Sequence, residues 1–170
     1  PKPVRLLKRD MEASARLTND FFDITCRSVM LLCLSPDYIA GKMMIVRALL
    51  SGADLLVVTP SSLPLTTIDE PIDFAAMVPA QVVESLKSTM QKSRLSRITS
   101  LIIGGAPLSP GTEVELEKLP VDMYATYGMT ETVSHVALRR IGDSLSLYCA
   151  LDGISFSIDE RNCLIIHAPH

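Results

Sequence analysis

The chain has 170 residues, of which 48% are hydrophobic and 21% are charged, and its formal net charge is -3. A chain of this length and composition can bury a sizeable core, so we expect one globular domain, or one domain with part of a second, and not a disordered polypeptide. The mildly acidic balance without a basic stripe argues against nucleic acid as the main partner. The apolar runs are too short to span a bilayer, and we therefore expect a soluble, cytoplasmic protein.

The cysteines show neither a Cys-x-x-Cys pair nor the spacing of a zinc site. Two of them, Cys33 and Cys163, lie inside apolar runs, where a free thiol packs as a small hydrophobic side chain. We therefore expect reduced, buried thiols at Cys26, Cys33, Cys149 and Cys163.

Apolar segments along the chain alternate between the spacing of helices and the short runs of strands. Residues 8–24 repeat apolar side chains at helical spacing with charged residues between them, which predicts an amphipathic helix. Gly52 is placed to end a second helix, and Pro79 and Pro110 are placed to begin later ones. In chain order, the pattern predicts a helix over 8–24, a strand over 28–34, a helix over 38–53, a strand over 54–59, a loop over 60–71, a strand over 74–78, a helix over 79–93, a strand over 98–105, a helix over 109–119 and a strand over 121–127.

Strands that alternate with helices of this length indicate an α/β fold, with a mostly parallel sheet and flanking helices. The last part of the chain differs, because residues 154–159 alternate apolar and polar side chains, a turn follows, and residues 163–168 form a second short run. This pattern predicts an antiparallel hairpin with one face buried. We therefore divide the chain into an α/β subdomain at residues 1–141 and the start of a β-rich subdomain at residues 142–170.

Two junctions that follow predicted strands carry residues suited to a ligand. At the first, Gly104 and Gly105 end an apolar strand, and Ser109 precedes Pro110 as the cap of a helix. In an open α/β sheet, glycines at the carboxyl end of a strand let backbone amides approach a nucleotide. A plain strand-to-helix turn is the alternative, because a glycine pair lacks the specificity of a full phosphate-binding fingerprint.

The second junction, residues 126–131, is called the signature loop below. Tyr127 offers a flat face for a base, and Gly128 permits a tight turn. Thr130 offers a hydroxyl to phosphate oxygens, and Glu131 offers a hard oxygen ligand for Mg²⁺. Together these residue types predict a nucleoside phosphate site, with a solvated polar loop as the alternative.

These stretches resemble the motifs of a known family. "YGMTE" at residues 127–131 is similar to the signature of the adenylate-forming superfamily of acyl-CoA synthetases, luciferases and peptide-synthetase adenylation domains, and "GGAPLS" at residues 104–109 is similar to the motif that precedes it there. "RDMEASARLTNDFF" resembles the helix after the family's phosphate-binding loop, and the opening "PKP" resembles the end of that loop. The resemblance runs throughout the chain and covers the middle of the family's large N-terminal domain.

The resemblance implies roles for individual residues. Tyr127 lies against the adenine, Thr130 donates a hydrogen bond to the α-phosphate, and Glu131 binds Mg²⁺. Thr130 and Glu131 are thus the implied catalytic residues. The implied nucleotide site, part of which also borders the acyl pocket, comprises Gly104, Gly105, Ala106, Pro107, Thr126, Tyr127, Gly128, Met129 and Thr130.

Within the superfamily, "YGMTETVSHVALRR" and "YIAGKMMIVRALLSGADLLVV" look most like the ligases that join o-succinylbenzoate to coenzyme A in menaquinone synthesis. This resemblance implies a small carboxylic acid, ATP and coenzyme A as substrates, with Mg²⁺. The acid would attack the α-phosphate of ATP to give an acyl-adenylate and pyrophosphate, and the thiol of coenzyme A would then displace AMP. A ligase for another aryl or acyl acid and a non-catalytic nucleotide-binding module are the alternatives.

Four residues are candidates for binding the acid. Arg47 lies in the apolar run "MMIVRALL", where an unpaired guanidinium is costly to bury and so needs an anionic partner, which a dicarboxylic substrate offers. A position at the helix rim with the charge in solvent is the alternative. Ser134 and His135 follow the signature loop and would face the second carboxylate or the keto group, although a lone histidine is often structural. Tyr38 stands where many acyl-CoA synthetases carry a histidine that gates the acyl channel.

Several parts of the family pattern are absent from these 170 residues. The phosphate-binding loop is represented only by Pro1 and Lys2, and the aspartate that binds ribose and the lysine that completes adenylation have no counterpart. The resemblance therefore implies that this stretch is inactive by itself. Formation of a homo-oligomer is left open by the sequence.

Overall fold

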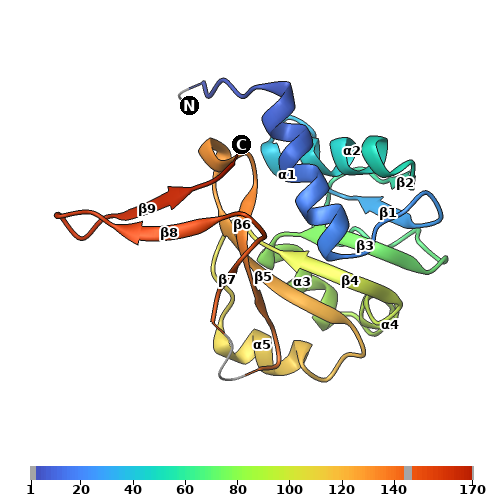
Figure 1. Cartoon of the computed structure of the whole chain (residues 1–170). Coiled ribbons are helices and arrows are strands. Elements are labelled where there is room, and N and C mark those ends of the chain that lie inside the picture. Colours follow the sequence, from blue (N-terminus) through green and yellow to red (C-terminus); the bar gives the residue numbers. More distant parts are fainter. Residues whose placement is uncertain (1–2, 144–146, 170) are drawn as a thin grey trace.

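The computed structural model describes residues 3–143 and 147–169, so the expectation for the opening "PKP" lies largely outside the described residues. Figure 1 shows a mostly parallel sheet flanked by helices, with a small hairpin beside it. The elements are α1 (Lys8–Phe21), β1 (Val29–Leu32), α2 (Ile39–Ser51), β2 (Asp54–Val57), β3 (Ile72–Met77), α3 (Pro79–Lys87), α4 (Thr89–Leu95), β4 (Ile98–Ile103), α5 (Pro110–Leu116), β5 (Asp122–Gly128), the 3-10 turn η1 (Thr130–Thr132), β6 (His135–Arg140), β7 (Cys149–Ala150), β8 (Ser155–Ile158) and β9 (Leu164–His167).

The main sheet has seven strands in the order β2-β1-β3-β4-β5-β6-β7. The first five in that order run parallel, while β6 and β7 are antiparallel additions. Helices connect the parallel strands from β1 to β2 and from β3 through β5, which is the connection that parallel pairing needs. The predicted α/β fold is confirmed.

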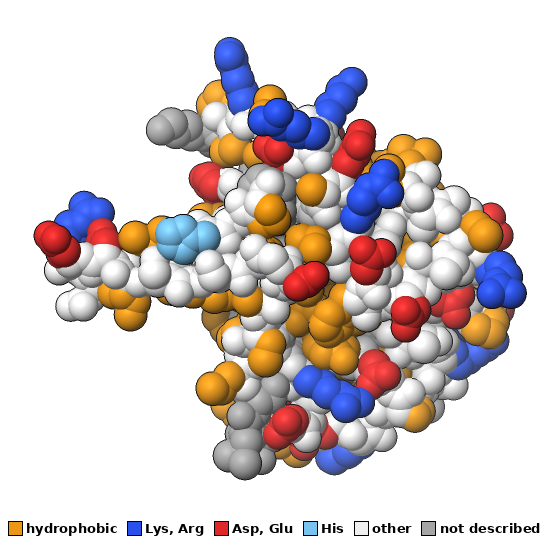
Figure 2. All heavy atoms as spheres, in the orientation of Figure 1, with side chains coloured by type: hydrophobic (Ala, Val, Ile, Leu, Met, Phe, Trp, Pro, Cys, Tyr) orange, Lys and Arg blue, Asp and Glu red, His pale blue; other side chains and the backbone are white. Residues whose placement is uncertain are grey.

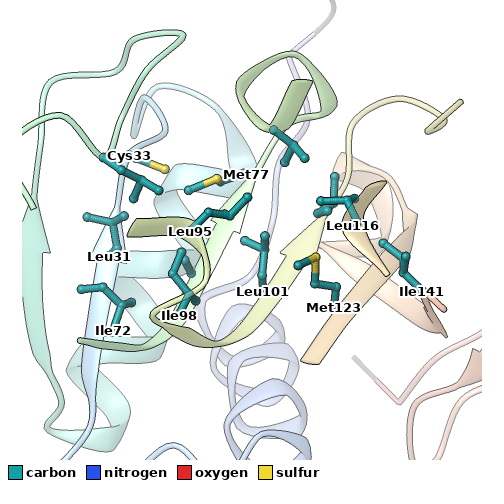
Figure 3. Close-up of a cluster of buried hydrophobic side chains, with 14 of the residues drawn as sticks. Leu31, Cys33, Ile72, Met77, Leu95, Ile98, Leu101, Leu116, Met123 and Ile141 are labelled. Carbon is teal, nitrogen blue, oxygen red and sulfur yellow. The ribbon is translucent and has the colours of Figure 1, made fainter. Parts of the chain in front are cut away.

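Both faces of the sheet are buried, which explains why its strands read as nearly continuous apolar runs. Met30 and Leu32 pack on the side of α1 and α2, whereas Leu31 and Cys33 pack on the side of α3, α4 and α5. Figure 3 shows this second core, in which Leu95 and other helical side chains meet the strands. The carboxyl ends of the central strands are thereby held at one edge between two layers of helices.

Two local signals in the sequence have the predicted outcome. Gly52 ends α2 in the left-handed conformation with φ 72°, and its N–H donates to the Ala48 carbonyl at 2.9 Å. Ser109 caps α5, its hydroxyl accepting a hydrogen bond from the Thr112 N–H at 3.2 Å, with Pro110 in the first turn. Local chemistry determines these two ends, through the backbone freedom of Gly52 and the side-chain hydroxyl of Ser109.

The single helix predicted over residues 79–93 is wrong, because the segment forms two helices. Ser88 is extended, with ψ 122°, and its hydroxyl accepts from the Gln91 N–H as the cap of α4. The break lets α4 contact the loop at residues 60–71, before β3. Gln91 accepts from the Leu65 N–H at 3.2 Å, and Arg94 donates to the Leu65 carbonyl at 3.0 Å. These distant contacts compensate for the interrupted helix.

Strand β6 was not predicted from the sequence. It pairs antiparallel with β5, and β7 pairs with β6 in the same sheet. The separate two-stranded sheet consists of β8 and β9 only. The division of the chain near Gly142 into two subdomains stays a prediction.

The hairpin of β8 and β9 pairs as predicted, with Ser155 opposite His167 and Ile158 opposite Leu164. The expected buried face is wrong, because the hairpin projects away from the sheet (Figure 1) and Ile158 is 69% exposed. Only its base packs, through Phe156 and its neighbours, against the core. Apolar side chains therefore show along the hairpin in Figure 2.

The prediction of buried cysteines is right for Cys33 and wrong for the others. Cys33 is fully buried, and burial raises the pKa of its thiol to about 12. Cys26, Cys149 and Cys163 are exposed, and all four thiols are free. Cys163 belongs to an apolar run, but that run lies in the projecting hairpin. Among the described residues, no helix combines the length and apolar content needed to cross a bilayer.

Candidate active site

A cavity of about 260 Å³ opens at the carboxyl ends of the parallel strands, where ligands bind in open α/β sheets. Its walls come from the segments that follow β1, β3, β4 and β5, from α2 and from the start of β6. Of the residues predicted to form the site, the cavity is lined by Arg47, Gly104, Gly105, Thr126, Gly128, Met129, Thr130, Ser134 and His135. The two junctions and the arginine helix therefore meet at one place.

The glycine pair after β4 makes one wall of the cavity. Gly105 has φ 86°, in the left-handed region that favours glycine. At Gly104, an added Cβ would lie 2.1 Å from Oγ1 of Thr126, so the hydroxyl would have to move. The pair thus allows the end of β4 to lie directly against the start of the signature loop.

The corner between β5 and β6 is tightly built. An added Cβ on Gly128 would lie 2.1 Å from the Ser134 carbonyl oxygen and 2.5 Å from the His135 Cα, so only glycine fits. Val133 is buried with φ 64°, a conformation that costs energy for a β-branched residue. Packing against α1 and α2 holds Val133 in place. The corner thereby fixes the signature loop at the cavity mouth.

Thr130 and Glu131 lie in the short turn η1, at the beginning of this corner. Thr130 is half-buried and lines the cavity, whereas Glu131 is exposed and lies outside the lining. Within residues 3–143 and 147–169, no salt bridge involves Glu131. The same residues contain no group of three or more His, Cys, Asp or Glu side chains able to hold a metal ion alone. A metal here would need ligands from a bound molecule.

Arg47 is the most unusual residue of the cavity, because its side chain is only 1% exposed. Its Nη2 donates to Ser134 Oγ at 3.0 Å, and Nη1 lies 3.8 Å from the Met44 sulfur. Its buried Nε has no hydrogen-bond partner among the residues that the structure describes. Burial lowers the pKa of Arg47 to about 9, so it stays charged at neutral pH. The alternative of a guanidinium at the helix rim in solvent is therefore wrong.

His135 is also buried, at 5% exposed. Its Nε2 lies 3.3 Å from the Thr18 hydroxyl, and its Nδ1 lies 3.4 Å from the Ser134 hydroxyl. Burial, and secondly the charge of Arg47, holds the pKa of His135 well below its ordinary value. The imidazole is consequently neutral, and it is part of the structure of the cavity wall.

The free energy of unfolding is expected to fall as the pH drops below about 6.5, the pKa of an unfolded-state histidine. Below that pH the unfolded chain binds a proton at His135, whereas the folded chain does not, because burial lowers the pKa of this histidine. The neutral His135 therefore makes its full contribution to the free energy of unfolding above this pH. As the pH falls towards the lower pKa of the folded state, this contribution decreases by up to about 1.4 kcal/mol per pH unit. Urea titrations between about pH 5 and pH 8 measure it.

The variant His135→Gln should show a flatter dependence of stability on pH than the unmodified protein. His167→Gln, on the exposed hairpin, is the matched control and should leave the dependence unchanged. Equal slopes in the unmodified protein and His135→Gln would contradict the neutral, buried imidazole.

Other predicted site residues lie outside the cavity lining. Ala106 and Pro107 are exposed beyond the end of β4, and Tyr38 is 74% exposed at the start of α2. Tyr127 has its ring on the side of Tyr148, with ring centroids 6.1 Å apart. Their roles towards a nucleotide or an acid stay predictions.

The sequence did not identify Thr18 or the apolar lining. Thr18 is fully buried on α1, 117 positions from the histidine it contacts, and nothing in its local pattern distinguishes it. Part of the apolar lining lies within or at the ends of predicted strands and was detectable in principle from that position: Leu34, Ala76, Met77, Val78 and Ile102.

A mostly parallel α/β sheet with a glycine-lined cavity at its carboxyl edge is the architecture of ligand-binding α/β proteins. The family model described as AMP-binding enzyme matches residues 1–152. The chain therefore belongs to the AMP-binding enzyme family, and the resemblance noted in the sequence is confirmed.

Similar proteins include a 2-succinylbenzoate–CoA ligase of Enterococcus faecalis, 26% identical over 147 residues, which are 85% of this chain and 30% of that ligase. The crystal structure of an acyl-CoA synthetase (AMP-forming)/AMP-acid ligase II-like protein from Dyadobacter fermentans is 36% identical with a TM-score of 0.92, covering 99% of this chain and 49% of that one. An O-succinylbenzoate coenzyme A synthetase from Bacillus subtilis, in complex with ATP and magnesium ion, is 17% identical with a TM-score of 0.78, covering 97% of this chain and 36% of that one, and shares the fold. The chain spans less than a third of the Enterococcus ligase and about half of the Dyadobacter protein.

Proposed function

We propose that the protein containing this chain is an ATP-dependent acid–CoA ligase of the AMP-forming type, with o-succinylbenzoate as its acid. The observation that carries the proposal is a buried, charged Arg47 that has no acidic partner among the described residues and lies in the same cavity as the signature loop. The similarity of this chain to a 2-succinylbenzoate–CoA ligase supports the choice of acid.

A guanidinium in this position needs an anion. Within residues 3–143 and 147–169, no salt bridge includes Arg47. A dicarboxylic acid supplies one carboxylate for the reaction and a second that Arg47 would bind. A buried guanidinium binds a carboxylate strongly, because hydrogen bonding and charge act together in a medium of low dielectric. The apolar lining of the cavity suits the aromatic ring of such an acid.

The signature loop would hold the nucleotide. Thr130 would donate to the α-phosphate, and the absence of a side chain at Gly105 would let the backbone there approach the nucleotide. Glu131 fits a magnesium site, because Mg²⁺ commonly takes one or two carboxylates together with substrate phosphates. When bound there, the metal would neutralise phosphate charge. The adenine would lie outside the cavity, against Tyr127, Ala106 and Pro107.

The proposed reaction has two steps. A carboxylate oxygen of the acid attacks the α-phosphorus of ATP, the bond to pyrophosphate breaks, and an acyl-adenylate forms. The sulfur of coenzyme A then attacks the acyl carbon, the thiol proton is lost, and AMP leaves. The chain's own contribution is to orient the acid and to present preorganised donors where negative charge develops, which is the main source of catalysis in such transfers.

The full-length protein, incubated with ATP, Mg²⁺, coenzyme A and o-succinylbenzoate, is expected to form AMP and the aryl-CoA thioester, both detectable by mass spectrometry. Acetate, benzoate and a fatty acid are the matched controls, because each lacks the second carboxylate that Arg47 would bind. Thioester with another acid alone would keep the ligase and overturn the choice of acid. Absence of nucleotide turnover with every acid would overturn the ligase and favour a nucleotide-binding module.

A further inference from the structure

We propose that Thr18 and His135 are positioning residues, which act through the Ser134 hydroxyl to hold the Arg47 guanidinium in the cavity. Thr18 comes from α1, Arg47 from α2, and the other two from the start of β6, so three separate elements meet at this point. The inference rests on the proposed function for the part that concerns acid binding.

The contact between the Thr18 hydroxyl and the Ser14 carbonyl favours one direction for the hydrogen bonds that link these side chains. The Thr18 hydroxyl has a single proton and donates it to the Ser14 carbonyl at 3.2 Å. It therefore accepts from His135 Nε2, at 3.3 Å, which places the imidazole proton on Nε2. In a neutral imidazole, Nδ1 is then an acceptor.

The directions of the two remaining hydrogen bonds, from Ser134 to His135 and from Arg47 to Ser134, follow from the same reasoning. Ser134 Oγ lies 3.4 Å from Nδ1 of His135, and it donates its proton there. Its lone pair is thus turned towards Arg47, whose Nη2 donates to it at 3.0 Å. The order of donors is Arg47 to Ser134 to His135 to Thr18, and it ends on a helix carbonyl.

The burial of these groups restricts the side chains that form this chain of hydrogen bonds. Thr18 is fully buried, and His135 is nearly so, and each polar atom of the pair has a partner in the chain. The neutral imidazole is consistent with the low pKa of His135, which follows from burial and secondly from the charge of Arg47. Because the polar side-chain atoms of Thr18 and His135 are all satisfied, this pair holds one arrangement of its side chains.

This order has a consequence for ligand binding. While Ser134 donates to His135, its hydroxyl has no proton left for a ligand. Arg47 then supplies donors in this part of the cavity, through the guanidinium N–H groups that Ser134 does not engage. The hydrogen-bond chain thus holds the guanidinium through Nη2, while Nη1 contacts the weakly accepting Met44 sulfur, so the guanidinium keeps N–H groups for an anionic group.

The decisive variant is Thr18→Val, which has nearly the same shape but neither donates nor accepts a hydrogen bond. Thr18→Ser keeps the hydroxyl and is the matched control. Nitrogen-15 NMR of the full-length protein, with His135→Gln for assignment, is expected to show the neutral Nε2–H form of His135. In Thr18→Val this form should give way, at least in part, to the Nδ1–H form, and Thr18→Ser should retain it.

A second NMR measurement needs no substrate. The two Nη groups of Arg47 should give separate signals because the guanidinium is held, and these signals should merge in Thr18→Val. An Nδ1–H form in the unmodified protein would overturn the proposal even if Thr18→Val failed to fold. Unchanged His135 and Arg47 signals in Thr18→Val would overturn it as well.

The functional arm compares kinetic constants. In Thr18→Val, KM for o-succinylbenzoate should rise about 10-fold, the loss expected for one hydrogen bond near a charged group, with kcat little changed. Thr18→Ser should have the same KM for o-succinylbenzoate as the unmodified protein. Changed NMR signals with an unchanged KM would overturn the positioning role. A protein that turns over no acid would overturn the proposed function, while the Arg47 signals would still decide whether Thr18 positions the guanidinium.

Discussion

Replacing Arg47 by methionine is expected to make the protein more stable and, at the same time, a poorer binder of its acid. Methionine has similar length and fills the same apolar surroundings without a buried charge. Because replacing buried charges with apolar side chains of similar volume commonly stabilises, the free energy of unfolding should rise by about 1–4 kcal/mol. KM for o-succinylbenzoate should rise about 10- to 100-fold through loss of the charged hydrogen bonds.

The control for this variant is Arg139→Met. Arg139 makes two hydrogen bonds to Glu113, at 3.0 and 2.6 Å, and lies outside the cavity lining. Removing it leaves the Glu113 carboxylate without that partner, so stability should fall while KM for the acid stays the same. Chemical denaturation and steady-state kinetics of the full-length protein measure both quantities. If Arg47→Met also lowered stability and left KM unchanged, its role would be structural.

Replacing Glu131 by glutamine is expected to reduce formation of the acyl-adenylate by about 100- to 1,000-fold, because a metal on phosphate oxygens contributes several kcal/mol and each tenfold corresponds to about 1.4 kcal/mol. The change keeps the size of the side chain and removes its charge. Stability should change little, since Glu131 is exposed and forms no salt bridge with the described residues. Exchange of labelled pyrophosphate into ATP measures the adenylation step directly.

Glu70→Gln provides the comparison for this variant. Glu70 is another exposed glutamate, in the loop before β3, and it does not line the cavity. Its replacement should leave pyrophosphate exchange unchanged. Near-normal exchange in Glu131→Gln, at both low and high Mg²⁺ concentration, would remove the metal role from this residue.

The elements that the sequence predicted correctly are those with strong local signals. The parallel strands are continuous apolar runs, Gly52 ends a helix through its backbone freedom, and Ser109 begins one through its side-chain hydroxyl. The prediction failed where distant contacts decided the outcome. Ser88 breaks a helix that its neighbours favour, because the separate α4 can then bind the preceding loop.

The candidate site shows the same division. The residues of the signature loop and the glycine pair could be selected from their order, and the structure brings most of them to one cavity. The sequence also indicated that Arg47 needs an anionic partner. It could not show that the guanidinium is fully buried or that Ser134 holds it, since that requires β6 to return beside β5.

By itself, the sequence determined the alternation of helices and strands, the mostly parallel sheet and the chemistry available at the signature loop. These follow from side-chain periodicity and from the properties of single residues, which act over short distances along the chain. Only the tertiary structure decided that Thr18, Arg47 and His135 share one buried chain of hydrogen bonds. Their contacts join residues far apart in the sequence, and the protonation and direction of each group depend on neighbours that only the folded sheet and helices bring together.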